Sequence, residues 1–155
     1  MSVQQSFEQL ISLAIQREEE AYEFYTKASE EATLKSSGKL LQELAKQEIG
    51  HKEKLMEALK TDVCDTFTCK TVAEIEDIGL SKYLIDIPLA ADSTPQEILV
   101  VAIKREDGAN SFYKTLSELT GVAAHRTVFE TLAKEEQKHK EILEGLYDDI
   151  FQPDN

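Results

Sequence analysis

The chain has 155 residues, the usual size of one domain with a single sizeable core. It carries 17 Lys and Arg against 30 Asp and Glu, which gives a formal net charge of −13. Such a surface repels phosphate backbones and anionic lipid headgroups, so we expect no nucleic acid and no membrane among its partners. The longest apolar run, Ile98 to Ile103, is far too short for a membrane span.

Composition also favours a helical protein of the cytoplasm. The first ten residues contain neither the basic nor the apolar segment of a secretion signal, and two cysteines cannot form a disulfide framework. We therefore expect a cytoplasmic location. Only six glycines and three prolines interrupt a sequence rich in Ala, Glu, Lys and Leu, which predicts long helices.

The sequence contains an internal repeat. Residues 14–25 read AIQREEEAYEFY and residues 102–113 read AIKREDGANSFY, with seven of twelve positions identical. The same offset of 88 residues, without a gap, aligns residues 44–48 (LAKQE) with 132–136 (LAKEE), and 51–53 (HKE) with 139–141 (HKE). We interpret the chain as two copies of one unit of two helices.

We expect helices at about 6–33, 37–60, 94–120 and 122–150. Ser6 and Thr94 are the expected N-caps of the first and third helices, and Pro95 takes the first helical position, where its missing N–H has no intrahelical partner to lose. Gly38 and Gly121 mark short turns, which make the helices of each unit antiparallel.

Residues 61–93 join the two units and are too many for a turn, but enough to run the length of a bundle. The predicted fold class is all-α, a ferritin-like antiparallel four-helix bundle. It consists of one domain over 1–155, with helix-hairpin repeats at 6–60 and 94–150 and a long crossover between helices 2 and 3.

The crossover carries two further expectations. Cys64 and Cys69 are either a redox-active or metal-binding pair or ordinary reduced thiols, which a cytoplasmic setting favours. The apolar segment 83–91 suggests self-association, and we expect a homodimer.

Every predicted helix carries charged or polar residues in the middle of its apolar face. The first and third helices each place one glutamate there, and the second and fourth each place a Glu-x-x-His pair. Four carboxylates and two imidazoles would therefore meet inside the bundle. The six residues are Glu18, Glu48, His51, Glu106, Glu136 and His139.

Glutamates are rarely buried without a partner, and these apolar faces contain no Lys or Arg. Four converging carboxylates without a cation would suffer desolvation and mutual repulsion, and two divalent metal ions would neutralise them. Oxygen and imidazole ligands suit iron, with manganese or zinc as substitutes. The alternative is a purely structural repeat with ordinary core histidines, but it leaves the glutamates unpaired.

The spacing of the six residues assigns roles within such a site. Glu-x-x-His places both side chains on one face of a helix, about 4.5 Å apart along its axis. One glutamate can thus bridge two metals while its histidine binds one of them. Glu48 and Glu136 are the bridging candidates, and Glu18 and Glu106 the terminal ones.

Two tyrosines lie on the same faces as the terminal glutamates. Tyr25 and Tyr113 follow Glu18 and Glu106 by seven residues. Their hydroxyls either form hydrogen bonds with the ligand carboxylates or simply accompany apolar packing.

These motifs resemble the rubrerythrin branch of the ferritin-like di-iron carboxylate superfamily, over nearly the whole chain. The resemblance is carried by Glu18 with Phe24-Tyr25, Glu48-x-x-His51, Glu106 with Phe112-Tyr113, and Glu136-x-x-His139. It implies a cofactor of two iron ions and an oxidoreductase that reduces hydrogen peroxide or dioxygen, as a peroxidase in oxidative stress.

The chain also departs from the usual rubrerythrin pattern. It lacks the Cys-x-x-Cys pairs of a rubredoxin domain, so electrons are expected from a separate donor such as a rubredoxin-like protein. Ala109 and His139 stand where typical rubrerythrins have carboxylates, and the resulting symmetric ligand set resembles that of bacterioferritin. The alternatives are therefore a ferroxidase or iron-handling protein of bacterioferritin type, and a metal-binding protein without turnover.

Overall fold

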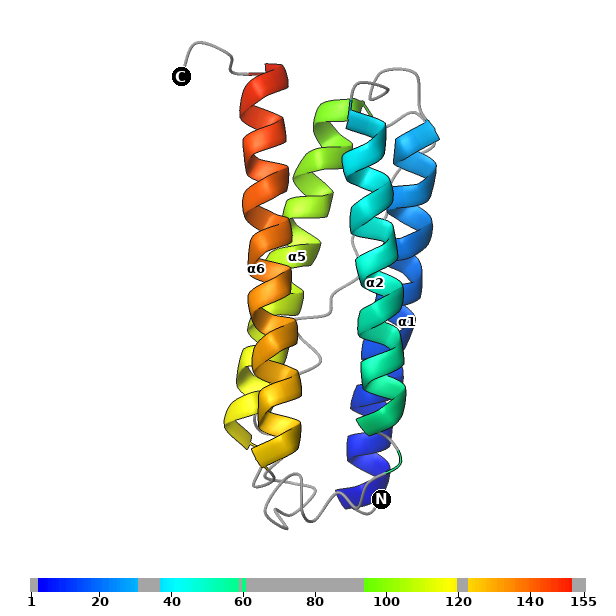
Figure 1. The fold of residues 1–155 in the computed structure, drawn as a ribbon, viewed down its shortest axis with the longest axis vertical. Coiled ribbons are helices and arrows are strands. Elements are labelled where there is room, and N and C mark those ends of the chain that lie inside the picture. The colour runs from blue at the N-terminus through cyan, green and yellow to red at the C-terminus, as the bar shows by residue number, and fades with distance from the viewer. Residues whose placement is uncertain (1–2, 31–36, 59, 61–93, 120–122, 152–155) are drawn as a thin grey trace.

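The computed structural model describes residues 3–30, 37–58, 60, 94–119 and 123–151, and these form four helices and no strand. The helices are α1 (Val3–Glu30), α2 (Gly38–Ala58), α5 (Pro95–Leu119) and α6 (Ala123–Phe151). α1 packs antiparallel against α2, and α5 packs antiparallel against α6 (Figure 1). The predicted all-α bundle of two helix hairpins is confirmed.

The direction of the helices is that of a ferritin-like bundle. α2 ends and α5 begins at opposite ends of the bundle, so these two consecutive helices run in the same direction (Figure 1). A chain with this order needs one long connection between its second and third helices. Residues 61–93 and Gly121 lie outside the described residues, and with them Cys64, Cys69 and the segment on which the dimer expectation depends.

The first helix begins earlier than its sequence suggested. α1 starts at Val3, so the prediction that Ser6 is its N-cap is wrong. The preceding residues, Gln4 and Gln5, include no proline or glycine, so their propensity does not stop the helix from extending past Ser6.

The start of α5 follows the prediction. The backbone N–H of Glu97 donates to the Thr94 hydroxyl oxygen at 3.1 Å, and the N–H of Ile98 donates to the Thr94 carbonyl oxygen at 2.9 Å. Pro95 is the first residue of the helix. Thr94 is therefore the N-cap, and it holds the start of the helix that carries Glu106.

Gly38 allows a close approach within the first hairpin. It is the first residue of α2, and a Cβ atom added to it would lie 3.3 Å from the carbonyl oxygen of Ser29 in α1. A larger residue would push the start of α2 away from the last turn of α1.

The core consists of two apolar clusters, and each draws residues from all four helices. The lower cluster in the view of Figure 1 contains Ile11, Ala14, Leu55, Phe112, Tyr113, Leu116, Phe129, Leu132 and Ala133. The upper cluster contains Tyr25, Ala28, Leu41, Leu44, Ala45, Leu99, Ala102 and Leu143.

Residues that are equivalent in the two repeats, 88 positions apart, lie in different clusters. Ile11 in the lower cluster corresponds to Leu99 in the upper one, and Tyr113 corresponds to Tyr25. The two hairpins are therefore related by an approximate twofold axis across the bundle. Along every helix, the polar residues of the predicted site lie between the two clusters.

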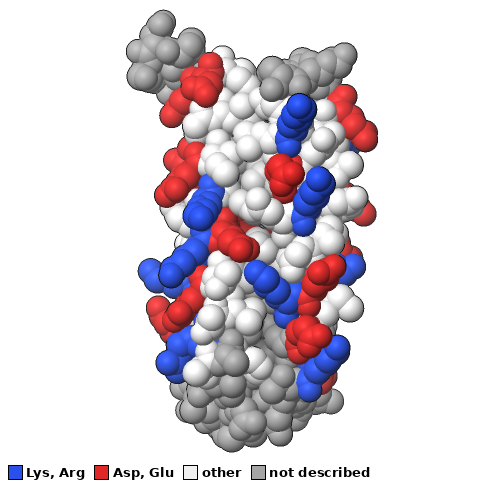
Figure 2. Space-filling view, in the orientation of Figure 1, with Lys and Arg blue, Asp and Glu red and all other residues white. Residues whose placement is uncertain are grey.

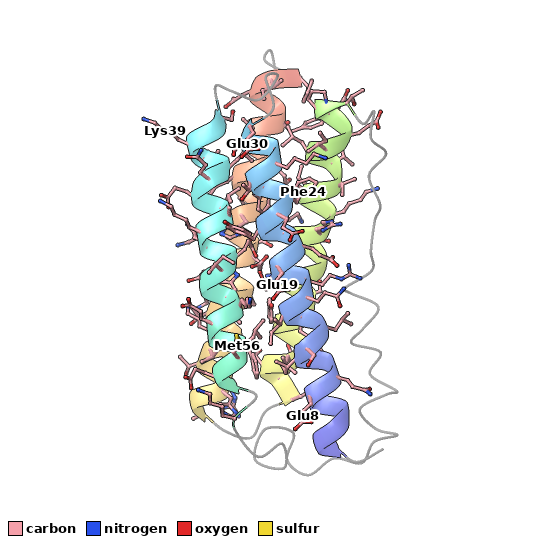
Figure 3. The ribbon with its side chains drawn as sticks, turned by 90° about the vertical axis from the view of Figure 1, so that its right-hand side faces the viewer. Glu8, Glu19, Phe24, Glu30, Lys39 and Met56 are labelled. Carbon is pink, nitrogen blue, oxygen red and sulfur yellow. The ribbon has the colours of Figure 1, made fainter. Side chains whose placement is uncertain are left out.

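Charged side chains cover the outside of the bundle. Basic and acidic residues alternate over the face in Figure 2, and Lys39 of α2 extends away from the bundle in Figure 3. Two ion pairs occupy equivalent positions in the two repeats: Lys52 with Glu19 at 2.8 Å and Lys140 with Asp107 at 2.9 Å. Within the described ranges, no helix is long and apolar enough to cross a membrane.

Replacing Thr94 by Ala removes the side-chain acceptor of the Glu97 N–H. We expect the free energy of unfolding of the metal-free protein to fall by about 1 kcal/mol, measured by urea denaturation followed by circular dichroism. Thr94→Ser keeps the hydroxyl and should retain most of the stability. An equal loss in both variants would contradict the capping role.

Candidate metal centre

The six residues predicted to form a site lie together in the middle of the bundle, and each exposes 3% or less of its surface. Their ligand atoms form two overlapping groups, within each of which all atoms lie within 4.8 Å of one another. One group is Glu18, Glu48, His51 and Glu136, and the other is Glu48, Glu106, Glu136 and His139. The two glutamates of the Glu-x-x-His pairs belong to both groups.

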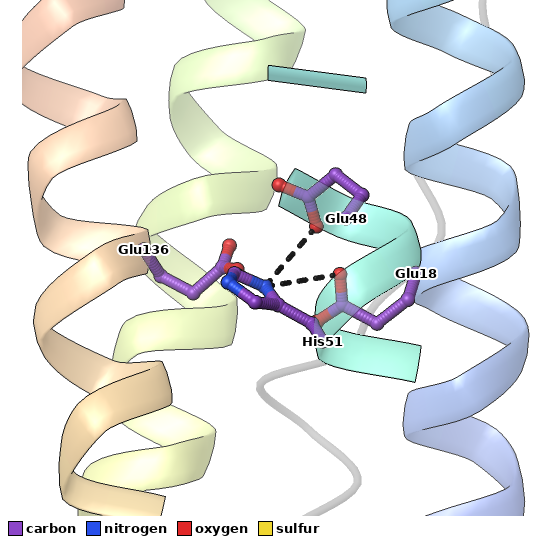
Figure 4. Close-up of side chains that lie close together, drawn as sticks. All are labelled: Glu18, Glu48, His51 and Glu136. Atoms are coloured by element: carbon purple, nitrogen blue, oxygen red, sulfur yellow. Dashed lines mark ion pairs between the residues drawn. The ribbon is translucent and has the colours of Figure 1, made fainter. Parts of the chain in front are cut away.

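The imidazole of His51 lies among three carboxylates from three helices (Figure 4). Its Nδ1 atom is 2.5 Å from Oε1 of Glu136, 3.5 Å from Oε2 of Glu18 and 3.6 Å from Oε2 of Glu48. Because Glu136 comes from the second hairpin, this histidine connects the two halves of the bundle.

His139 repeats this arrangement in the other half. Its Nδ1 atom is 2.8 Å from Oε1 of Glu48 and 3.5 Å from Oε1 of Glu106. The rings of His51 and His139 are nearly parallel, with centroids 5.7 Å apart. Both imidazoles thus direct Nδ1 towards the carboxylates.

Six donor atoms at the centre are buried and have no partner in hydrogen-bonding geometry among the described residues, one from each of the six residues, although each imidazole Nδ1 lies within ion-pair distance of a carboxylate oxygen. They are Oε2 of Glu18 and Glu106, Oε1 of Glu48 and Glu136, and Nδ1 of both histidines. Buried polar atoms are normally satisfied, since leaving one unpaired costs about 1–3 kcal/mol. A set of carboxylate oxygens and imidazole nitrogens without thiolates suits iron, manganese or zinc, so the residues present fit two such ions.

The carboxylates resist being ionised together. Burial raises the pKa of Glu48 well above its usual value, and the negative charges of Glu18 and Glu106 raise it further. Burial and the charges of Glu106 and Glu48 likewise raise the pKa of Glu136. Without a cation, the fold therefore favours the protonated forms of its two shared glutamates.

The pKa values of two other groups, Glu106 and His51, are also shifted by their neighbours. Burial alone would raise the pKa of Glu106, but the nearby Glu136 and His139 outweigh it and lower that pKa. Burial would lower the pKa of His51, yet the close carboxylates of Glu136, Glu18 and Glu48 raise it. Negative charge at the centre is thus compensated by protons when no metal is bound.

Each terminal glutamate is held by a tyrosine from the opposite hairpin. The hydroxyl of Tyr113 donates to Oε1 of Glu18 at 2.6 Å, and the hydroxyl of Tyr25 donates to Oε1 of Glu106. Burial and the neighbouring carboxylates raise the pKa of both tyrosines, so both hydroxyls remain donors. One oxygen of each terminal glutamate is thereby fixed, and its other oxygen is buried without a hydrogen bond.

Two residues of the site were not predicted from the sequence. Nε2 of His51 lies 2.5 Å from Oε2 of Glu135, and Nε2 of His139 lies 2.6 Å from Oε1 of Gln47. Each partner directly precedes the shared glutamate of the opposite hairpin. The signal available in the sequence was a polar residue at this position in both repeats.

The sequence matches the rubrerythrin family over residues 1–59 and 97–155. The chain belongs to the rubrerythrin family. The match covers both hairpins and all six residues of the cluster, and no rubredoxin domain is found within these 155 residues. No curated protein and no solved structure gives a significant match.

The structure also places the residue that departs from the usual rubrerythrin pattern. Ala109, one turn after Glu106, is partly buried against the lower apolar cluster. It corresponds by the repeat to Ala21, which packs against the upper cluster. The inner residues of the two halves are therefore alike.

Metal-free protein should lose stability as the pH rises. Glu48 and Glu136 have raised pKa values in the fold, so their contribution is present below the unfolded value of about 4.3 and is lost as the pH rises through their folded values. The raised pKa of His51 likewise makes stability fall as the pH rises above about 6.5. The lowered pKa of Glu106 makes stability rise with pH, but only below about pH 4.3.

We therefore expect the free energy of unfolding to fall as the pH rises above about 4.3, by up to about 1.4 kcal/mol per pH unit for each proton taken up on folding. Urea denaturation of metal-free protein at several pH values measures this slope. Glu48→Gln removes one of the groups and should flatten the profile and stabilise the metal-free protein at pH 8. Stability that rises with pH would refute the assignment.

Proposed function

We propose that the cluster holds two iron ions and that the protein is a non-haem di-iron oxidoreductase, which reduces hydrogen peroxide with electrons from a separate donor. One observation carries this proposal. Six buried residues, each with one donor atom outside hydrogen-bonding geometry, form two groups that share Glu48 and Glu136, in a chain of the rubrerythrin family.

In this proposal Glu48 and Glu136, which belong to both groups, would help to hold both ions. Glu18 and His51 complete one metal position, which we name the His51 position. Glu106 and His139 complete the other, the His139 position. The tyrosines keep one oxygen of each terminal glutamate in a hydrogen bond, so that its other oxygen remains directed at the metal.

Two ferrous ions bound there would supply the two electrons that, together with two protons, convert hydrogen peroxide into two water molecules. The chain's own contribution is a site that bulk water does not enter freely. Apolar clusters lie on both sides of the six residues, and each of these exposes 3% or less of its surface. Such burial favours an oxidant as small as peroxide or dioxygen.

A specific feature supports the second candidate, ferroxidation for iron handling. Both hairpins supply a histidine, and Ala109 stands where an extra carboxylate would distinguish one half from the other. This symmetric ligand set resembles that of bacterioferritin. Metal binding without turnover is the third candidate, since metal alone would satisfy the buried carboxylates.

Single-turnover oxidation separates these candidates. The protein is loaded anaerobically with two ferrous ions and mixed with hydrogen peroxide or with dioxygen, and the optical absorbance is followed. Faster reaction with peroxide supports the peroxidase. Faster reaction with dioxygen, with iron retained beyond two ions per chain, supports ferroxidation, and two bound ions that neither oxidant changes would leave only metal binding.

Replacing Glu48 by Ala should slow the oxidation by at least about 100-fold, because this change removes a ligand shared by both ions. Mutating a residue that only forms a hydrogen bond with a metal ligand already lowers metal affinity or activity by about 10–100-fold. The matched control is Glu43→Ala, an exposed position on the same helix. If the Glu48 variant binds two ferrous ions and reacts at the rate of the control, the proposed site is wrong.

A further inference from the structure

The two metal positions differ in the residue outside each histidine. Gln47 and Glu135 are equivalent under the offset of 88, and each accepts a contact from a histidine Nε2. The distances are nearly the same, 2.5 Å from His51 to Glu135 and 2.6 Å from His139 to Gln47. The two acceptors differ in their chemistry, because one is a carboxylate and the other a neutral amide.

A second difference accompanies the first. Nζ of Lys54 lies 3.8 Å from Oε1 of Glu135, so the carboxylate that faces His51 has a nearby positive charge. The residue equivalent to Lys54 in the second repeat is Ile142, which carries no charge. The charged acceptor and its counter-charge thus occur together on the His51 side, while the His139 side has a neutral residue at both equivalent positions.

The acceptor of a histidine N–H affects the nitrogen that binds metal. With Nδ1 directed at the carboxylates, Nε2 carries the proton and donates it. A hydrogen bond to a carboxylate is roughly twice as strong as one to a neutral acceptor, and it makes the imidazole a better electron donor and fixes its ring. A hydrogen bond to a neutral amide increases electron donation by the imidazole less and fixes its ring less firmly.

Given the two-metal site of the proposed function, on which this step rests, we infer that Glu135 makes the two positions unequal. The His51 position binds a divalent ion more tightly and fills first, and the His139 position binds more weakly. The directly bound residues do not explain such a difference, because the repeat matches Glu18 with Glu106 and His51 with His139, and the other two glutamates are shared. Glu135 is thus a positioning residue that acts through His51.

The test is titration of metal-free protein with Co²⁺, followed by visible absorbance and calorimetry. Wild type should bind two ions in two steps whose dissociation constants differ by about 10-fold or more. Glu135→Gln keeps an acceptor of the same size but removes the charge, so the tighter step should weaken by about 10-fold and approach the other. Gln47→Glu should instead tighten the weaker step.

Two controls make the assignment specific. Glu130→Gln makes the same chemical change at an exposed position of α6 and should leave both steps unchanged. In wild type, His51→Ala should abolish the tighter step and His139→Ala the weaker one. In the double variant Gln47→Glu, Glu135→Gln these effects should be exchanged.

The outcomes separate this inference from the proposed function. If two ions bind to wild type and Glu135→Gln changes neither step, the inequality is refuted while the two-metal site stands. The same holds if the double variant leaves the order of filling unchanged. If no Co²⁺ binds to correctly folded wild type, both the proposed function and this inference are overturned.

Discussion

The burial of four carboxylates at the centre of the bundle is the constraint on which the rest of the structure depends. Desolvation and mutual repulsion raise the pKa values of Glu48 and Glu136, so the metal-free centre compensates its charge with protons. The centre therefore contributes little to stability by itself, and the two apolar clusters on either side of it must hold the four helices together. A cation that replaced the protons would turn this unfavourable centre into a link between the hairpins.

The contacts that cross the bundle explain why such a link matters. The helix backbones approach each other most closely within each hairpin, α1 with α2 and α5 with α6. The two hairpins are joined by the two apolar clusters and, between them, by the side chains of the site. His51 reaches Glu136, His139 reaches Glu48, and Tyr113 reaches Glu18. A metal ion shared by these side chains would bind both hairpins at once, so metal binding and the packing of the two halves are coupled.

The inner part of this arrangement could be predicted from the sequence because it follows helical periodicity. A glutamate in an apolar stripe, repeated after 88 residues, fixes which side chains face inward. The start of α1 could not be predicted, since a serine such as Ser6 caps a helix only where the preceding residues stop it. Gln47 and Glu135 were missed for a different reason. They lie at the edge of the buried face, and their contact with a histidine depends on how the two hairpins face each other, which periodicity does not encode.

The same distinction between inner and outer residues decides where the two halves of the repeat can differ. An inner glutamate cannot be exchanged without leaving the remaining buried carboxylates and histidines with an incomplete set of ligands, and the repeat keeps all six. Glu135 exposes 34% of its side chain, and Gln47 is exposed, so water can compensate a change at either position. A nearly symmetric bundle can therefore acquire two chemically different metal positions through substitutions that leave every ligand, and the core around it, in place.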